Sequence, residues 1–342
     1  MAAPEVAIIA ARATPVGRLT PRGDELPEGF DHDVLTAVVL DALADAGLRP
    51  ADIGSAVFTM PPPPTRQLGF ATYMAAQLGI RCSGQLAEVQ EMGITGGLAF
   101  DQAAADVLLG RANFALALGV AIQSGGDSAE AMDHSLRVVG DVDFQSPFGL
   151  TPISWYAFDA VRYMYETGAT RADIASVAVK SRRHALDNPV AQFRKTLTLE
   201  EVLAQRPIVE PLGLLEVPAR ADGAICLVLC AADRARALGV PFVTVKGRGF
   251  HSEGYHQIGD VAHDMTGFPA ARIAAGRALD EASCALADIH VAELYAPCTI
   301  TEVLVSESIG FFARGTGARA AAEGESALGG RIPLRPEWAR GL

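Results

Sequence analysis

One polar segment of the chain gathers side chains that can move protons or bind a metal ion. The segment FHSEGYHQIGDVAHD holds three histidines and three acidic residues, namely His251, His256, His263, Glu253, Asp260 and Asp264. Spacings of five and seven residues do not place the histidines on one helical face, as a zinc motif would. We therefore predict no metal site, and we expect a polar loop in which His256 and His263 are candidates for acid or base chemistry.

A glycine-rich turn is the second feature with chemical meaning. In VQEMGITGGLAF, residues 89–100, Gly93, Thr95, Gly96 and Gly97 lie between an apolar run and an alanine-rich helix. Glycines allow a ligand to approach the backbone closely, and the N-H groups at the start of a helix favour negative charge. The pattern is neither G-x-G-x-x-G nor G-x-x-x-x-G-K-[ST], so we do not expect a nucleotide-phosphate loop.

Thiols and a cluster of basic residues are the remaining reactive groups. The five cysteines form no CxxC pair and no zinc-type spacing, so we expect reduced thiols that mostly pack in the core. Arg182 and Arg183, followed by His184, Arg194 and Lys195, form a basic cluster in an acidic chain. Such a cluster can hold phosphate groups, or it can be the solvated face of a helix.

Composition excludes several classes of function. The 342 residues include 28 basic and 40 acidic side chains, a net charge of -12, which argues against a nucleic-acid partner held by a general basic surface. No window of the sequence approaches the roughly 18 to 20 apolar residues that cross a bilayer. The first residues, MAAPEVAIIAARATPVGR, lack the features of a signal peptide. We therefore expect a cytoplasmic protein without membrane association.

Strands and helices alternate in the first 122 residues and must position these side chains. Apolar runs predict buried strands at 5–13, 55–60 and 113–121, and helical periodicity predicts helices at 33–47, 66–78 and 98–109. This alternation is typical of an α/β architecture with a largely parallel sheet. Residues 123–221 are richer in Asp, Ser, Pro and aromatic residues, so we interpret them as an inserted α-rich lobe. The strand pattern resumes with DGAICLVLC.

An internal repeat is the most informative feature of the sequence. ALADAGLRPADI, residues 42–53, and ALDEASCALADI, residues 278–289, match at six positions with an offset of 236 residues. In both copies we predict a helix, a connector and then a strand, SAVFTM in the first and HVAELY in the second. A chance match between alanine-rich helices is the alternative, but the order of elements also matches, so we expect two duplicated βαβαβ-type halves with a lobe inserted in the first.

The repeat also predicts domain boundaries. We expect an N-terminal half at residues 1–122 plus 222–240, the inserted lobe at 123–221, and a C-terminal half at 241–342. Only 32 residues follow Gly310, and they are mostly glycine, arginine and polar residues. We therefore expect the second half to be truncated, without its last helix and strands.

A duplicated α/β half with a lobe inserted in its first copy resembles the thiolase superfamily. The segments RYMYETGATRADIASVAVKSRRHALDNPVAQF, ADGAICLVL and ELYAPCTITEVLVSESIGF resemble the lipid-transfer-protein (SCP2-type) branch of that superfamily. The resemblance implies a thiolase fold with α-β-α-β-α layers. It also implies a coenzyme A thioester as substrate and no further cofactor.

The family's catalytic motifs are altered in this chain. The family carries a nucleophilic cysteine in a motif close to C-A-S-G-G, and Gly93 stands at the position of that cysteine. The second motif, H-D-x-F, is replaced by Tyr295, Ala296, Pro297 and Cys298. The third and fourth motifs, G-H-P and C-x-G, are missing after GGRIPL. Since glycine has no side chain to acylate, we do not expect ordinary thiolase activity.

This chain has a tyrosine where the second motif has its histidine. In this respect it is similar to one group in this branch, the aldolases that split steroid side-chain CoA thioesters with an OB-fold, acyl-CoA-associated partner protein. The resemblance implies that Tyr295 is the base or proton relay, and a tyrosine with an ordinary pKa of about 10 needs neighbouring donors for that role. It implies further that the turn at Gly93, Thr95, Gly96 and Gly97 supplies oxyanion donors.

The family's use of the inserted lobe implies that Arg182, Arg183 and Lys195 hold the phosphates of CoA. Thiolases commonly dimerise near residues 85–92, so we also expect a homodimer. A catalytically degenerate thiolase-like subunit with a binding or scaffolding role is the alternative to an aldolase. The sequence leaves both readings open.

Overall fold

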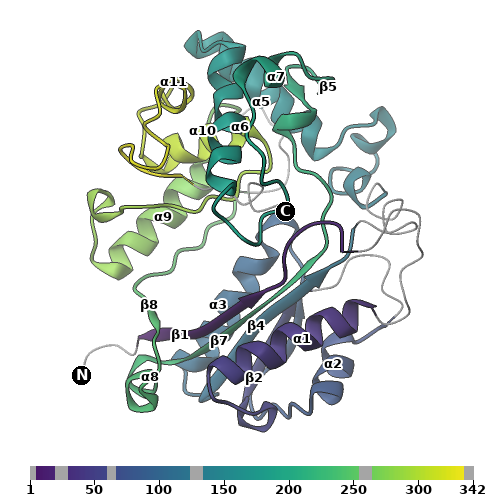
Figure 1. Cartoon of the computed structure of the whole chain (residues 1–342), viewed down its shortest axis with the longest axis vertical. Coiled ribbons are helices and arrows are strands. Elements are labelled where there is room, and N and C mark those ends of the chain that lie inside the picture. Colours follow the sequence, from purple (N-terminus) through teal and green to yellow (C-terminus); the bar gives the residue numbers. More distant parts are fainter. Residues whose placement is uncertain (1–4, 20–29, 60–66, 124–133, 254–263, 335–342) are drawn as a thin grey trace. The chain divides into compact units, whose positions relative to one another are not determined.

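The computed structural model describes most of the chain, as two compact units (Figure 1). The described residues are 5–19, 30–59, 67–123, 134–253 and 264–334. The first unit comprises Met1–Met132 and Ala221–Lys246, and the second comprises Asp133–Arg220 and Gly247–Leu342. Most of the segment that we interpreted as a separate lobe therefore belongs to the same compact unit as the second half.

A six-stranded mixed sheet forms the centre of the first unit. Its strands are β1 (Val6–Ala13), β2 (Ser55–Thr59), β3 (Leu86–Val89), β4 (Phe114–Ala121), β7 (Gly223–Ala231) and β8 (Val243–Val245). Their order is β3-β2-β4-β7-β1-β8. The β3, β2 and β4 strands are parallel, whereas β7 is antiparallel to both β4 and β1, and β8 is antiparallel to β1.

Helices cover both faces of this sheet (Figure 1). They are α1 (Phe30–Asp45), α2 (Phe70–Leu78) and α3 (Thr95–Leu108), with α8 (Ala232–Leu238) after β7. Strand side chains alternate between the faces: Ala56 and Phe58 of β2 pack with α1 and α2, whereas Val57 packs with α3. The alanine-rich face of α3, with Ala99 and Ala103 buried, allows close approach to the sheet.

The second unit is mainly helical. Its elements are α5 (Pro152–Thr167), α6 (Arg171–Ala185), α7 (Leu199–Leu203), α9 (Pro269–Ala282), α10 (Thr299–Ile309), α11 (Gly317–Ala322) and the short strands β5 (Pro207–Val209) and β6 (Leu212–Gly213). Within the residues that the structure covers, no helix is long and apolar enough to cross a bilayer.

Helix α10 is the central element of the second unit. Eight of its residues are buried: Thr299, Ile300, Thr301, Glu302, Val303, Leu304, Ser306 and Glu307. Apolar side chains from α5, α6 and α11 pack around it in one core cluster. Because α5 and α6 belong to the inserted segment, this core joins that segment to the second half.

Local geometry repeats at the two copies found in the sequence. Gly47 closes α1 with φ +66°, and the equivalent Ser283 closes α9 with φ +52°. Asp52 and Asp288 each accept a hydrogen bond from the backbone N-H three residues earlier, at 2.8 Å in both copies. The duplication is therefore present in the structure, down to the turn that follows each helix.

One element differs from the prediction. Residues 290–295, predicted as a strand, form only a single parallel bridge, between Ala292 and Leu334. The prediction of a regular strand there was wrong, since no adjacent strand runs along this segment in the described part of the second unit. The strand that precedes this segment in the chain, β8, belongs to the first unit and pairs there with β1.

An ion pair within the core connects α6 to α10. The Nζ of Lys180 donates to the carboxylate of Glu302 and to the carbonyl of Leu334, the latter at 3.0 Å. The side chains of Lys180 and Glu302 are 4% and 2% exposed. Burial raises the pKa of Glu302, and the ammonium of Lys180 opposes that shift. Two buried charges thus depend on one another.

We predict that Lys180→Met destabilises the protein by about 3 to 5 kcal/mol, because it leaves the Glu302 carboxylate buried without its cation. The double variant Lys180→Met/Glu302→Leu should recover most of that loss, since it removes both charges. Urea denaturation of the three proteins measures the difference. A double variant no more stable than Lys180→Met would contradict this account of the pair.

Candidate functional site

The glycine-rich turn leads directly into α3. A short 3-10 turn, Met92–Ile94, precedes the helix, and Met92 adopts φ +43°, in the left-handed region. The hydroxyl of Thr95 accepts from the N-H of Glu91 at 2.8 Å and donates to the carbonyl of Met92 at 2.7 Å. Thr95 therefore fixes the turn. Helix α3 begins at this residue, three residues earlier than the start at residue 98 that the sequence predicted.

The glycines of this turn are exposed. Gly93, Gly96 and Gly97 are all accessible to solvent. A Cβ atom added to Gly96 or Gly97 would meet nothing within 4 Å, so packing within the described residues does not require glycine there. Their effect is to leave the backbone at the start of α3 uncovered by side chains. Such a helix start can stabilise an anion or oxyanion, and this role for the turn stays a prediction.

Tyr295 lies just before α10, in the second unit. Burial alternates along the chain there: Leu294 and Ala296 are buried, whereas Glu293 and Tyr295 are exposed. Tyr295 is 49% exposed, so about half of its surface is accessible to solvent. The two buried neighbours fix the backbone that presents it.

Cys298, three residues further on, is fully buried in the core around α10. Burial raises the pKa of its thiol well above the usual range, and the carboxylates of Glu216 and Asp159 add to the shift. A buried thiol that resists ionisation is a packing residue rather than a nucleophile. Tyr295, not Cys298, is therefore the accessible functional group of the altered second motif.

A buried carboxylate holds the start of α10. Glu216 accepts hydrogen bonds from Arg171 at 2.8 Å, from Gln205 at 2.8 Å and from the hydroxyl of Thr299 at 3.2 Å. Burial raises the pKa of Glu216, and Arg171 and the hydrogen bonds oppose that shift. Since Arg171 and Gln205 belong to the inserted segment, Glu216 fixes the beginning of α10 against that segment.

The histidine-containing segment is only partly described. His256 and His263, our candidates for acid or base chemistry, lie outside the described residues, and their roles stay a prediction. Glu253 accepts from the N-H of Ala270 at 2.7 Å, in the first turn of α9. Among the residues that the structure describes, no group of acidic, histidine and cysteine side chains could hold a metal ion.

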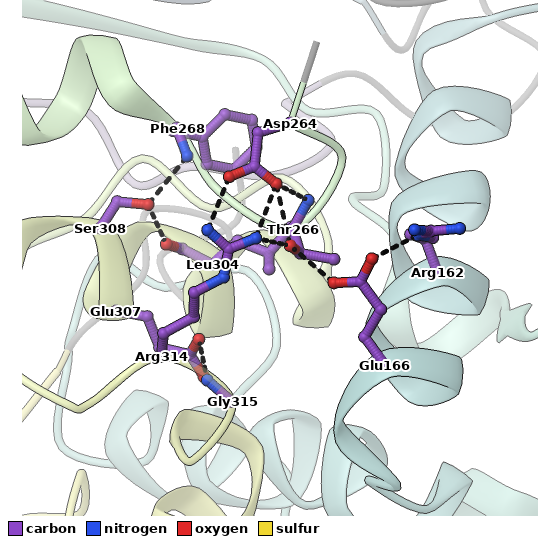
Figure 2. A network of polar contacts seen from close by, with 10 residues as sticks. All are labelled: Arg162, Glu166, Asp264, Thr266, Phe268, Leu304, Glu307, Ser308, Arg314 and Gly315. Atoms are coloured by element: carbon purple, nitrogen blue, oxygen red, sulfur yellow. Dashed lines mark hydrogen bonds and ion pairs between the residues drawn. The ribbon is translucent and has the colours of Figure 1, made fainter. Parts of the chain in front are cut away.

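Asp264 is the centre of a polar network (Figure 2). Its carboxylate accepts two hydrogen bonds from Arg314, at 2.8 and 2.9 Å, and one from the hydroxyl of Thr266 at 2.9 Å. The Thr266 hydroxyl oxygen also lies 3.3 Å from a carboxylate oxygen of Glu166, and Arg162 donates to Glu166 at 2.6 Å. These contacts join the end of the histidine-containing segment and Thr266 to α5 and to the turn before α11.

The predicted CoA-binding residues lie on or near α6. Arg182 packs its guanidinium over the ring of Phe193, 4.0 Å from the ring centre, and burial lowers its pKa. Arg183 and Lys195 are exposed. The exposed pair is accessible to phosphate groups, whereas Arg182 is partly covered by its own aromatic partner.

The sequence did not single out Tyr156 and Asp159 of α5. Tyr156 packs against the core cluster that contains Cys298, and Tyr295, Cys298 and Asp159 all act electrostatically on its phenol. Burial raises the pKa of Tyr156 well above its usual value, and these three groups add to the shift. The aromatic run ISWYAFDAVRYMY gave no spacing that distinguishes Tyr156 from its neighbours.

Models of known protein families match both halves of the chain. The thiolase N-terminal domain matches residues 6–231, and the thiolase C-terminal domain-like family matches residues 253–337. The chain therefore belongs to the thiolase superfamily and has the thiolase fold, as its sequence predicted.

Individual relatives refine this assignment. The benzoylsuccinyl-CoA thiolase subunit BbsB of Thauera aromatica is 31% identical over 314 residues, which cover 90% of this chain and 78% of that protein. A steroid side-chain-cleaving aldolase of Thermomonospora curvata is 33% identical over 309 residues, covering 86% of this chain and 76% of that protein. The solved Ltp2-ChsH2(DUF35) aldolase has a TM-score of 0.79 and 29% identity, covering 98% of this chain and 84% of that chain. These relatives confirm the predicted branch of the superfamily, which includes the steroid side-chain-cleaving aldolases.

We predict that iodoacetamide at mildly alkaline pH modifies exposed Cys284 but not Cys298 in the folded protein, because the Cys298 thiol is buried and resists ionisation. In urea both cysteines should react. Peptide mapping by mass spectrometry measures the two sites separately. Modification of Cys298 in the folded protein at the rate of Cys284 would show that it is an accessible thiolate.

Proposed function

We propose that the chain is an acyl-CoA aldolase of the thiolase superfamily, which cleaves or forms a C-C bond beside a thioester without a covalent cysteine. In the cleavage direction a base removes the proton of a β-hydroxyl group. The Cα-Cβ bond breaks, and its electron pair passes into the thioester enolate. Backbone donors stabilise the enolate oxygen. Protonation at Cα then gives a shorter acyl-CoA, beside a ketone or aldehyde.

A contrast between two positions carries this proposal. Gly93, at the position of the family's nucleophile, has no side chain, and the nearest thiol to the altered second motif, Cys298, is buried and resists ionisation. Tyr295 has a hydroxyl group and is 49% exposed. This set of groups supports proton transfer rather than acyl transfer to the protein.

The remaining residues take supporting roles in the proposal. Tyr295 is the base or proton relay, and the backbone around Gly93 and Gly96 supplies the oxyanion donors. His256 and His263 are further candidates for proton transfer. Three basic residues hold the CoA phosphates: Arg182 and Arg183 on α6, and Lys195 in the chain that follows the helix. CoA is part of the substrate, and the proposed reaction uses no other cofactor.

The proposal includes a partner protein and a second copy of the chain. The similar aldolase of known structure is a complex of Ltp2 with ChsH2(DUF35). By analogy, we propose that an OB-fold, acyl-CoA-associated protein binds this chain. For the homodimer, the supporting feature is β3, an edge strand of the described sheet. A groove of about 430 Å³ beside β3 is lined by Ala75, Ile80 and Leu86, among others.

We predict that Tyr295→Phe lowers the rate of C-C cleavage by about a hundredfold or more, because it removes the proposed base and leaves the ring in place. The assay incubates the protein with β-hydroxyacyl-CoA thioesters, with and without a co-encoded OB-fold protein. Chromatography of the products measures the shorter acyl-CoA and the ketone.

Tyr165→Phe is the matched control, since Tyr165 lies on α5, is 81% exposed and has no role in the proposal. It should keep the activity of the wild type, and thermal unfolding should show that both variants are folded. Full activity of Tyr295→Phe would refute its role as base. Absence of both turnover and CoA binding in the wild type, with and without the partner, would leave only a scaffolding role.

We predict that light scattering gives the mass of two chains for the purified protein, because an unpaired edge strand favours pairing with a second chain. Leu86→Lys should shift the equilibrium toward the monomer, since Leu86 lies on β3 and is 36% exposed. A mass equal to one chain at micromolar concentration would contradict the proposed homodimer.

A further inference from the structure

The first turn of α10 is held by a side chain from outside the helix. Cys298, at the N-cap of α10, makes no capping side-chain hydrogen bond within the described residues. The next residue, Thr299, begins the helix and is fully buried, and its hydroxyl donates to the carboxylate of Glu216 at 3.2 Å. A negative charge is favoured at the start of a helix. Glu216 therefore supplies the polar contact that the N-cap residue does not.

Other donors fix the Glu216 carboxylate, so Thr299 is held at a defined point. One oxygen, Oε1, also accepts from Arg171 at 2.8 Å. The second oxygen, Oε2, accepts from the other terminal nitrogen of Arg171, from the side-chain amide of Gln205 at 2.8 Å and from the N-H of Gly213 at 3.1 Å. Hydrogen bonds that involve charged groups are stronger than those between neutral groups. The buried carboxylate therefore keeps its position whether or not Thr299 contacts it.

The three residues between Tyr295 and Thr299 have little freedom. Ala296 and Cys298 are both fully buried. Between them, Pro297 fixes its own backbone angle φ and restricts the residue before it. A displacement of Thr299 is therefore transmitted to the backbone that carries Tyr295.

Glu216 also holds the helix on which this segment packs. Ala296 packs in one core cluster with Ala175 and Ala178 of α6. Arg171, the first residue of α6, contacts both oxygens of the Glu216 carboxylate. The same carboxylate thus fixes the beginning of α6, which supports Ala296, and the beginning of α10, which follows it.

We propose that Glu216 is a positioning residue for Tyr295, which sets the direction of the Tyr295 hydroxyl by holding the Thr299 hydroxyl at the start of α10. The inference rests on the proposed function, in which Tyr295 is the base or proton relay. Proton transfer depends on the distance and direction from which the base approaches, so a catalytic group needs a fixed backbone beneath it. Glu216 itself neither receives the substrate proton nor contacts the reacting atoms.

Two substitutions of Thr299 separate its hydrogen bond from its packing. Thr299→Val keeps the shape of the side chain and removes the hydroxyl, whereas Thr299→Ser keeps the hydroxyl and removes the methyl group. Both leave Glu216 with its other donors. Thr299→Ala, which also lacks the hydroxyl, replaces Thr299→Val should that variant fail to fold.

Tyr163→Phe is the matched control. It also removes one buried hydroxyl that donates to α10, but the acceptor is Glu307, near the opposite end of the helix. Thermal unfolding should show that this control and the Thr299 variants are folded.

The direct readout is fluorine NMR of the full chain labelled with 3-fluorotyrosine, which needs no substrate. The chain has six tyrosines, and the resonance that is absent from the Tyr295→Phe variant belongs to Tyr295. We expect Thr299→Val to shift or split this resonance, because the backbone before α10 is no longer held in one position. Glu216→Gln, which replaces one acceptor oxygen by an amide donor, should change the same resonance. Thr299→Ser and Tyr163→Phe should leave it unchanged.

Kinetics give a second readout. Thr299→Val should lower kcat for C-C cleavage by about ten- to a hundredfold with KM nearly unchanged, and Thr299→Ser should keep most of the wild-type rate. An unchanged Tyr295 resonance in folded Thr299→Val would overturn the proposal, and so would an equal change in Thr299→Ser. A resonance that changes only when the hydroxyl is lost, in a protein without aldolase activity, would support the positioning of Tyr295 by Glu216 and reject the proposed function instead.

Discussion

Burial of α10 is the constraint on which the second unit depends. A helix buried along most of its length cannot leave its polar side chains to water, so each of its two glutamates needs a partner from a neighbouring element. Glu302 accepts from Lys180 of α6. Glu307 accepts from the Tyr163 hydroxyl and from the N-H groups of Gly315 and Gly317, the latter two at 2.7 Å. These contacts hold the inserted segment and the second half as one core.

The same constraint sets the position of the candidate catalytic residue. Because the helix start is anchored by Glu216 and by buried Cys298, the backbone just before it is fixed, and alternating burial turns Tyr295 outward. The position of the proposed base thus depends on the contact between Thr299 and Glu216 at the start of α10.

Much of the fold could be predicted from the sequence because its signals are local. Strands β1, β2, β4 and β7, the helices that end at Gly47 and Gly79, and the repeated turns at Asp52 and Asp288 follow from periodicity and from glycine or carboxylate positions. The prediction of a largely parallel sheet was wrong, because β7 and β8 pair antiparallel with their neighbours. The strand predicted at residues 290–295 was wrong because strand formation needs a neighbour, which the apolar pattern does not report. The pairs Tyr163 with Glu307 and Lys180 with Glu302 are separated by 144 and 122 residues, so no local pattern could reveal them. Tyr295 was found through resemblance to a family motif.

The central claim is that this member of the thiolase superfamily breaks a C-C bond without forming an acyl-enzyme. Mass spectrometry of the intact protein during turnover of a β-hydroxyacyl-CoA, with simultaneous measurement of the products, tests it most directly. The account predicts that the shorter acyl-CoA accumulates while the mass of the protein stays that of the unmodified chain. A protein mass increased by the acyl group during turnover would contradict it.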